Sequence, residues 1–128
     1  MAIEKFITKS TEQTPYITLD PENGIFEMKG VSRPEDVNKN YIPVIQWFKE
    51  YKKAANDHTV IDFKFDYFNT ATAKLLYDVL ALLEEIKESG KKVLINWHYN
   101  EMDLDMKSAG QEFEDMVDLE FKFLSYKA

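Results

Sequence analysis

The stretch that decides the fold runs from Val60 to Gly90 and reads VIDFKFDYFNTATAKLLYDVLALLEEIKESG. In its first part, four apolar residues alternate with three charged ones: Ile61, Phe63, Phe65 and Tyr67 against Asp62, Lys64 and Asp66. This period of two predicts a β-strand with one buried face and one face in water. In its second part, apolar residues recur at helical spacing up to Ser89 and Gly90, which predicts a long α-helix that ends there.

The junction between this strand and helix carries two hydroxyl side chains, Thr70 and Thr72, directly behind Asn69. Asn and Thr are both good N-cap residues, and of the two threonines Thr70 is the better candidate because it directly follows the strand. The first backbone N–H groups of a helix are free, and the helix dipole favours negative charge near them. A phosphate on a threonine here would be tolerated by the fold, although spacing alone favours a purely capping role.

The remaining chain supplies further strands and helices on both sides of this unit. Strands are predicted at 6–8, 16–20, 24–29, 92–98 and about 121–126, and Gly30 is expected to end the third of them. A helix is predicted to start over Ser32 to Asp36 and to run to about Ala55, with a kink or restart caused by Pro43. A shorter helix follows Asp103, and its buried side is expected to hold Met106, Ala109, Phe113 and Met116.

The element order is therefore β-β-β-α-β-α-β-α-β. Strands that alternate with helices are expected to be parallel, whereas the first hairpin is antiparallel. Because charged residues occupy one face of the strand at 60–68, that face must meet solvent and cannot be covered by helices. The sequence thus predicts an α/β fold with a mixed sheet and helices packed mainly on one face.

Length and charge narrow the possible classes of function. We expect residues 1–128 to form a single domain, and the formal net charge of −7 without clustered Lys and Arg argues against nucleic acid and anionic membrane as partners. No window approaches about 20 apolar residues, and no signal peptide is recognised. Cysteine is absent, which fits a cytoplasmic location.

Catalytic and metal-binding motifs are not found in the sequence. The two histidines, His58 and His98, are far apart, and there is no Gly-x-Ser-x-Gly elbow and no glycine-rich phosphate loop. The acidic residues Glu101, Asp103 and Asp105 suit a solvated helix start better than a calcium loop. We expect no cofactor and no metal. The alternative function from a different class is that of a small acidic enzyme or ligand-binding domain with an unrecognised pocket.

Three segments carry a resemblance to a known family. They are YFNTATAK at 67–74, GVSRPEDV at 30–37 and NWHYNEMDLDM with AGQEF between 96 and 113. Together they resemble the SiaC family of bacterial regulatory phosphoproteins, from about Thr14 to the C-terminus. The resemblance implies a STAS-like regulatory domain of the anti-sigma-factor-antagonist type. The chain departs from the family pattern at Ala71 and Ala73, where serines are common, and at His98, where tyrosine is common.

The resemblance also implies a function. The unphosphorylated protein would bind and activate a diguanylate cyclase, which makes cyclic di-GMP. A serine/threonine kinase of the anti-sigma-factor type would phosphorylate Thr70, with Thr72 as the alternative acceptor, and a PP2C-type phosphatase would reverse this. Asn69, Thr70, Lys74 and Tyr99 are the expected partner-binding residues. A sigma-factor partner switch is the second alternative, and the sequence does not specify the oligomeric state.

Overall fold

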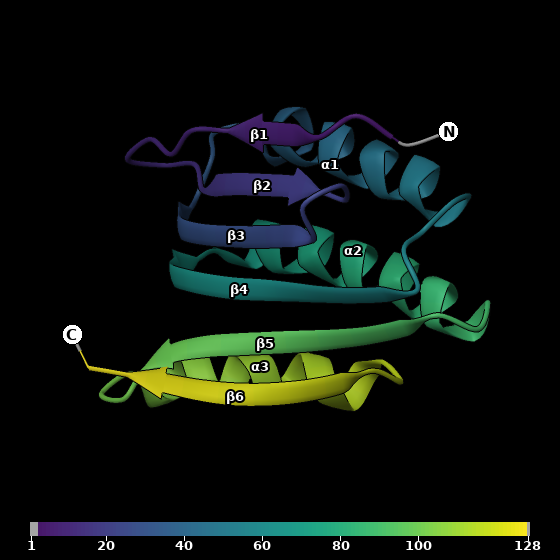
Figure 1. Cartoon of the computed structure of the whole chain (residues 1–128). Coiled ribbons are helices and arrows are strands. Elements are labelled where there is room, and N and C mark those ends of the chain that lie inside the picture. The colour runs from purple at the N-terminus through teal and green to yellow at the C-terminus, as the bar shows by residue number, and fades with distance from the viewer. Residues whose placement is uncertain (1–2, 128) are drawn as a thin grey trace.

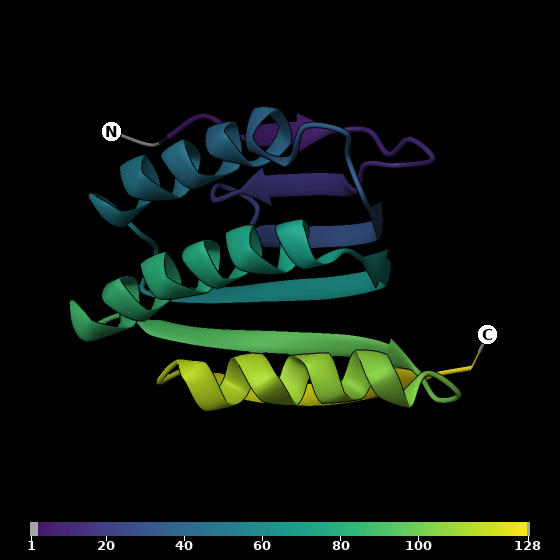
Figure 2. The same ribbon diagram turned by 180° about the vertical axis from the view of Figure 1, so that it is seen from behind.

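The computed structural model describes residues 3–127, which form one six-stranded mixed sheet with three helices on one of its faces. Figure 1 shows the sheet in front of the helices, and Figure 2 shows α1, α2 and α3 in front of the sheet from behind. The elements are β1 (Phe6–Thr8), β2 (Tyr16–Asp20), β3 (Ile25–Ser32), α1 (Val37–Lys52), β4 (His58–Phe68), α2 (Thr70–Glu88), β5 (Lys92–Asn100), α3 (Leu104–Met116) and β6 (Glu120–Tyr126). The predicted mixed sheet with helices on one face is confirmed.

The strand order in the sheet is the order of the strands in the chain, β1-β2-β3-β4-β5-β6. The first three strands pair antiparallel, and β3 to β6 pair parallel. Each parallel step moves one place in the same direction and is bridged by one helix. Because such crossovers share one handedness, all three helices fall on the same face.

The core lies between that face and the helices. Side chains of β4 alternate as predicted, with Ile61, Phe63 and Phe65 buried, while Lys64 and Asp66 are exposed and Asp62 is partly exposed on the helix-free face. Trp97 of β5 is buried in an aromatic cluster with the rings of Phe63, Phe68 and Phe113. Burial of large aromatic side chains of this kind contributes strongly to the stability of the fold.

A β-bulge changes the register at the end of β4. Gly30 pairs with Phe65 but Val31 pairs with Tyr67, so Asp66 is an extra residue in β4. Tyr67 is therefore 48% exposed, and the prediction that it is buried is wrong. Phe68 turns inward in its place and packs against Trp97 and Phe113. Gly30 has a φ of +106°, which glycine adopts without strain, so β3 continues to Ser32 instead of ending at Gly30.

Helix α1 begins later than the sequence suggested. Its N-cap is Asp36, whose Oδ1 accepts the Lys39 N–H at 3.1 Å, whereas Ser32 is the fully buried last residue of β3. The helix also ends at Lys52, before Ala55. One uninterrupted helix runs through Pro43, so the predicted restart does not occur. Pro43 is exposed, and its ring therefore meets solvent and not the sheet.

Replacing Pro43 with alanine is expected to stabilise the protein. Proline inside a helix costs about 3 kcal/mol, but it also restricts the unfolded chain, so we expect a gain of about 1–2 kcal/mol in the free energy of unfolding. Urea unfolding followed by circular dichroism measures this change. The exposed Gln46, one turn further along α1, provides the control, because Gln46→Ala should change stability by less than about 0.5 kcal/mol. A Pro43→Ala variant less stable than wild type would contradict this account.

Helix α3 packs against β5 through its one glycine. A Cβ atom built on Gly110 would lie 2.5 Å from Cδ1 and 2.6 Å from Nε1 of Trp97. The indole is fixed because its Nε1 donates to the Met106 carbonyl oxygen at 2.9 Å. Met106 and Phe113 are buried as predicted and Ala109 is partly buried, but Met116 is 60% exposed at the helix end, where the prediction is wrong.

Candidate functional site

One edge of the molecule gathers the carboxyl ends of the parallel strands and the starts of all three helices. Each helix begins with an Asx side chain that accepts the N–H of the third helical residue. The three caps are Asp36 to Lys39, Asn69 to Thr72 and Asp103 to Met106, with distances of 3.1, 2.9 and 3.0 Å. This geometry follows from βαβ connections, since each strand ends where the next helix begins. The junction between β4 and α2 therefore lies at an edge of the molecule that is formed by loops and helix starts.

Asn69, and not Thr70, is the N-cap of α2, which corrects the sequence-based assignment. The Asn69 side chain accepts the Thr72 N–H, and the Asn69 backbone N–H donates to the Ser32 carbonyl oxygen at 3.1 Å. Thr70 is thereby the first helical residue, and it is exposed. Within residues 3–127 the Thr70 hydroxyl makes no hydrogen bond to another protein group. An unbonded, exposed hydroxyl is free to enter the active site of a modifying enzyme.

Thr72 has the opposite environment. It is fully buried, and its Oγ1 donates to the Ser32 carbonyl oxygen at 3.2 Å. Thr72 Oγ1 also lies 2.9 Å from Ser32 Oγ, and Ser32 Oγ lies 2.7 Å from Tyr41 Oη. Burial raises the pKa of Tyr41 to about 12, although its bond to Ser32 acts in the other direction. Tyr41 is therefore protonated at neutral pH.

Ser32 and Tyr41 are residues of this site that the sequence did not assign to it. Ser32 lies in GVSRPEDV, which predicts a helix start, and Tyr41 lies within the helix predicted to follow. The signal that the sequence offered was the hydroxyl group that each of these two residues carries. Buried hydroxyls require partners, and that requirement could have linked them to Thr72.

The predicted partner-binding residues divide into two groups in space. Asn69, Thr70 and Lys74 lie together at the start of α2, where Lys74 is exposed four residues after Thr70 and thus on the same helix face. Tyr99 lies near the carboxyl end of β5, partly buried against the core, with Lys107 Nζ 5.8 Å from its ring centroid. No hydrogen bond among the described residues joins Tyr99 to the other three.

His98 lies on the other side of the sheet. Its Nε2 is 2.7 Å from Asp62 Oδ1, which also accepts a hydrogen bond from Asn96 Nδ2 at 3.1 Å. Asp62 belongs to the helix-free face, so the difference from tyrosine at this position does not alter the α2 junction. Across residues 3–127, no three His, Cys, Asp or Glu side chains are grouped so that they could hold a metal ion.

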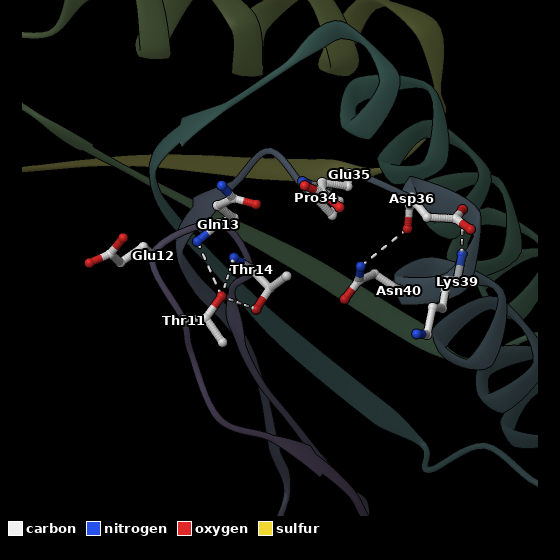
Figure 3. A pocket seen from close by; sticks show the side chains of 9 residues that line it. All are labelled: Thr11, Glu12, Gln13, Thr14, Pro34, Glu35, Asp36, Lys39 and Asn40. Atoms are coloured by element: carbon white, nitrogen blue, oxygen red, sulfur yellow. Dashed lines mark hydrogen bonds between the residues drawn. The ribbon is translucent and has the colours of Figure 1, made fainter.

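A hollow with a volume of about 720 Å³ lies between the β1–β2 loop and the start of α1. Figure 3 shows its side chains, which include Thr11, Glu12, Asp36, Lys39 and Asn40. Several of the polar groups are already paired: Thr11 Oγ1 accepts two backbone N–H groups, and Asp36 caps α1. It is an open hollow and not an enclosed cleft.

None of the helices within residues 3–127 is both long and apolar enough to cross a lipid bilayer.

Comparisons with known proteins agree with this geometry. Residues 8–126 match the family model described as SiaC family regulatory phosphoprotein. A protein of Pseudomonas aeruginosa strain UCBPP-PA14 is 31% identical over 113 residues, which cover 88% of each chain. The structure of apo-SiaC from Pseudomonas aeruginosa has a TM-score of 0.88 at 27% identity, covering 95% of this chain and 99% of that one.

SiaC of the same organism has also been solved in complex with the diguanylate cyclase SiaD, of which it is the activator. That SiaC has a TM-score of 0.87 at 28% identity, covering 94% of this chain and 99% of its own. The match therefore extends over nearly the whole of both chains in sequence and in fold. The chain belongs to the SiaC family of regulatory phosphoproteins.

Proposed function

We propose that this protein is a non-enzymatic, cytoplasmic switch that binds and activates a diguanylate cyclase while Thr70 is unphosphorylated. A serine/threonine kinase of the anti-sigma-factor type adds the phosphate, and a PP2C-type phosphatase removes it. The observation that carries the proposal is the contrast at the start of α2, where Thr70 is exposed and unbonded while Thr72 is buried and bonded. The SiaC relative that is bound to a diguanylate cyclase supports the choice of partner.

The position of Thr70 explains how one phosphate could act without unfolding the domain. The phosphate adds about −1.5 to −2 charges at the positive end of the α2 dipole, where the fold tolerates negative charge. Lys74 lies four residues further along α2, the spacing at which oppositely charged side chains on a helix can pair. A partner packed over this surface must instead desolvate the phosphate, and like charges brought together in an interface cost several kcal/mol. The modification thus acts on the complex and not on the fold.

The partner surface that we propose contains Asn69, Thr70 and Lys74 and extends toward Tyr99 along the same edge of the sheet. The start of α2 is held to the end of β3, because the Asn69 N–H and the Thr72 hydroxyl both donate to the carbonyl oxygen of Ser32. A rigid surface loses little conformational entropy on binding, which favours affinity. A modification on it therefore changes a preformed interface.

The test compares two forms of the full-length protein against the diguanylate cyclase of its native host. We expect the unphosphorylated form to bind the cyclase and to raise its rate of cyclic di-GMP synthesis. The phosphorylated form should bind with an affinity lower by on the order of a hundredfold or more. Treatment of the phosphorylated form with a PP2C-type phosphatase should restore activation, which controls for damage to the protein. Equal activation by both forms would refute the switch.

A further inference from the structure

Three hydroxyl groups from three different elements meet under the start of α2. They belong to Ser32 at the end of β3, Tyr41 in α1 and Thr72 in α2, and all three residues are fully buried. Ser32 Oγ lies 2.7 Å from Tyr41 Oη and 2.9 Å from Thr72 Oγ1. We call these three residues the hydroxyl chain. It joins the start of α2 to two elements that lie about 30 to 40 residues earlier in the sequence.

The direction of each hydrogen bond in the hydroxyl chain follows from counting protons. The Thr72 hydroxyl donates its one proton to the Ser32 carbonyl oxygen at 3.2 Å. The Ser32 hydroxyl must then donate to Thr72 Oγ1, and the Tyr41 hydroxyl must donate to Ser32 Oγ, because each group has a single proton. Every hydroxyl proton is used once, so the buried chain is complete without any further donor.

The hydroxyl chain is linked to the cap of α2 through one shared acceptor. The Ser32 carbonyl oxygen accepts both the Thr72 hydroxyl and the Asn69 N–H, and Asn69 Oδ1 accepts the Thr72 N–H at 2.9 Å. Asn69 and Thr72 are therefore both held on β3, on either side of Thr70. With its neighbours fixed in this way, the first turn presents Thr70 outward and keeps the Thr72 hydroxyl inside.

We propose that the hydroxyl chain determines which threonine is phosphorylated: it confines modification to Thr70 by holding the Thr72 hydroxyl in the core. This inference rests on the proposed function. In phosphoryl transfer the acceptor oxygen bonds to the γ-phosphorus of ATP, the bond to the departing ADP breaks, and a base of the kinase takes the hydroxyl proton. The acceptor oxygen must therefore lie in line with the bond that breaks. The Thr72 oxygen can reach such a position only when the first turn of α2 unwinds and two buried hydrogen bonds break. Tyr41 and Ser32 are thus positioning residues, because they act on the acceptor through Thr72.

The structure provides a matched control within the same helix. Tyr51, ten residues after Tyr41 in α1, is also fully buried, and its hydroxyl lies 2.7 Å from Thr59 Oγ1. Thr59 lies near the start of β4, at the opposite end of that strand from the α2 junction. Tyr51→Phe therefore removes a buried tyrosine–threonine hydrogen bond of the same length as the tyrosine–serine bond that Tyr41→Phe removes. It also removes the 3.1 Å bond that Tyr51 Oη accepts from the Asn56 N–H, so it is at least as severe a change. If Tyr41→Phe changes exchange or phosphorylation at Thr70 and Thr72 and Tyr51→Phe does not, the cause is the place of the lost hydroxyl and not a general loss of stability.

The first measurement is amide hydrogen exchange of the first turn of α2 in the full chain, followed by NMR, which needs no kinase. In Tyr41→Phe and Thr72→Val we expect exchange at Thr72 and Ala73 to accelerate about fivefold or more, as the loss of one net hydrogen bond predicts. In Tyr51→Phe, the exchange rates of these two amides should change no more than the variant's loss of global stability requires. Thr72→Ser, which keeps the hydroxyl, should restore the wild-type protection. Equal effects of Tyr41→Phe and Tyr51→Phe at these two amides would overturn the proposal.

The second measurement is the site of phosphorylation, mapped by mass spectrometry on protein isolated from the native host. We expect wild type and Tyr51→Phe to carry phosphate on Thr70 alone, and Tyr41→Phe and Ser32→Ala to carry a measurable share on Thr72. If Ser32→Ala does not fold, Tyr41→Phe decides the result, since it removes a single oxygen. Phosphate confined to Thr70 in every folded variant would overturn the specificity role while leaving the switch intact. A wild-type protein without phosphate between Asn69 and Lys74 would instead refute the proposed function itself, and the specificity role with it.

Discussion

Replacing Thr70 with alanine is expected to abolish phosphorylation by the cognate kinase while leaving cyclase binding nearly unchanged. Thr70 is the first helical residue and not the cap, so the Asn69 to Thr72 hydrogen bond that starts α2 remains. Alanine is also a better helix former than threonine. We therefore expect the free energy of unfolding to change by less than about 0.5 kcal/mol, as for other exposed positions. Phosphate incorporation, followed by mass spectrometry, should fall to background.

Two further substitutions at Thr70 separate its chemistry from its position. Thr70→Ser keeps a hydroxyl and should still be phosphorylated. Thr70→Glu adds a negative charge and should weaken cyclase binding, although one carboxylate only partly reproduces a phosphate. Labelling of Thr70→Ala at the wild-type level would show that another residue is the acceptor. Strong cyclase binding by Thr70→Glu would show that the charge at this position does not control the complex.

Replacing Gly110 with alanine is expected to destabilise the protein, although alanine is the stronger helix former. The propensity gain is about 1 kcal/mol. Against it, the new methyl group would lie less than 3 Å from three atoms of the Trp97 indole, which is hydrogen-bonded to Met106 and packed among aromatic rings. Overpacking of this kind costs about 3 kcal/mol or more where the neighbour cannot move. We therefore expect a net loss of about 2 kcal/mol, measured by urea unfolding.

Ser108 supplies the control for this experiment, because it is exposed in the same helix. Ser108→Ala also raises helix propensity, by less than Gly110→Ala does, and it makes no new contact, so it should leave stability unchanged or raise it by less than about 0.5 kcal/mol. Tryptophan fluorescence should report the disturbance of the indole in Gly110→Ala and not in Ser108→Ala. A Gly110→Ala protein as stable as wild type would mean that α3 moves away from β5 at little cost.

The sequence predicted those features of the fold that depend on local repetition. The period of two in 61–65 located the buried face of β4, and the solvent-facing charges correctly placed the helices on one face. It was wrong about Tyr67, because the bulge depends on pairing with Gly30, which lies 37 positions earlier in the chain. It was wrong about Ser32 for a related reason, since a capping hydroxyl and a buried hydroxyl look alike without knowledge of the partner.

The candidate site was predictable in its location but not in its internal structure. Asn69, Thr70 and Thr72 could be assigned to a helix start from a few neighbouring residues. Which of the two threonines is exposed depends on Ser32 and Tyr41, whose hydrogen bonds to this site cross between elements. Contacts of this range leave no periodic pattern in a single sequence. The acceptor assignment to Thr70 and the roles of Lys74 and Tyr99 remain predictions for the experiments above.

The strand order of the sheet has a consequence for how the chain reaches its structure. Because β1 to β6 follow one another in space as they do in sequence, each strand joins the edge of the sheet already formed. No strand has to insert between two others, and the longest loop closed between neighbouring strands spans a single helix with its turns. Folding can therefore follow synthesis from the N-terminus, strand by strand, with β6 added last.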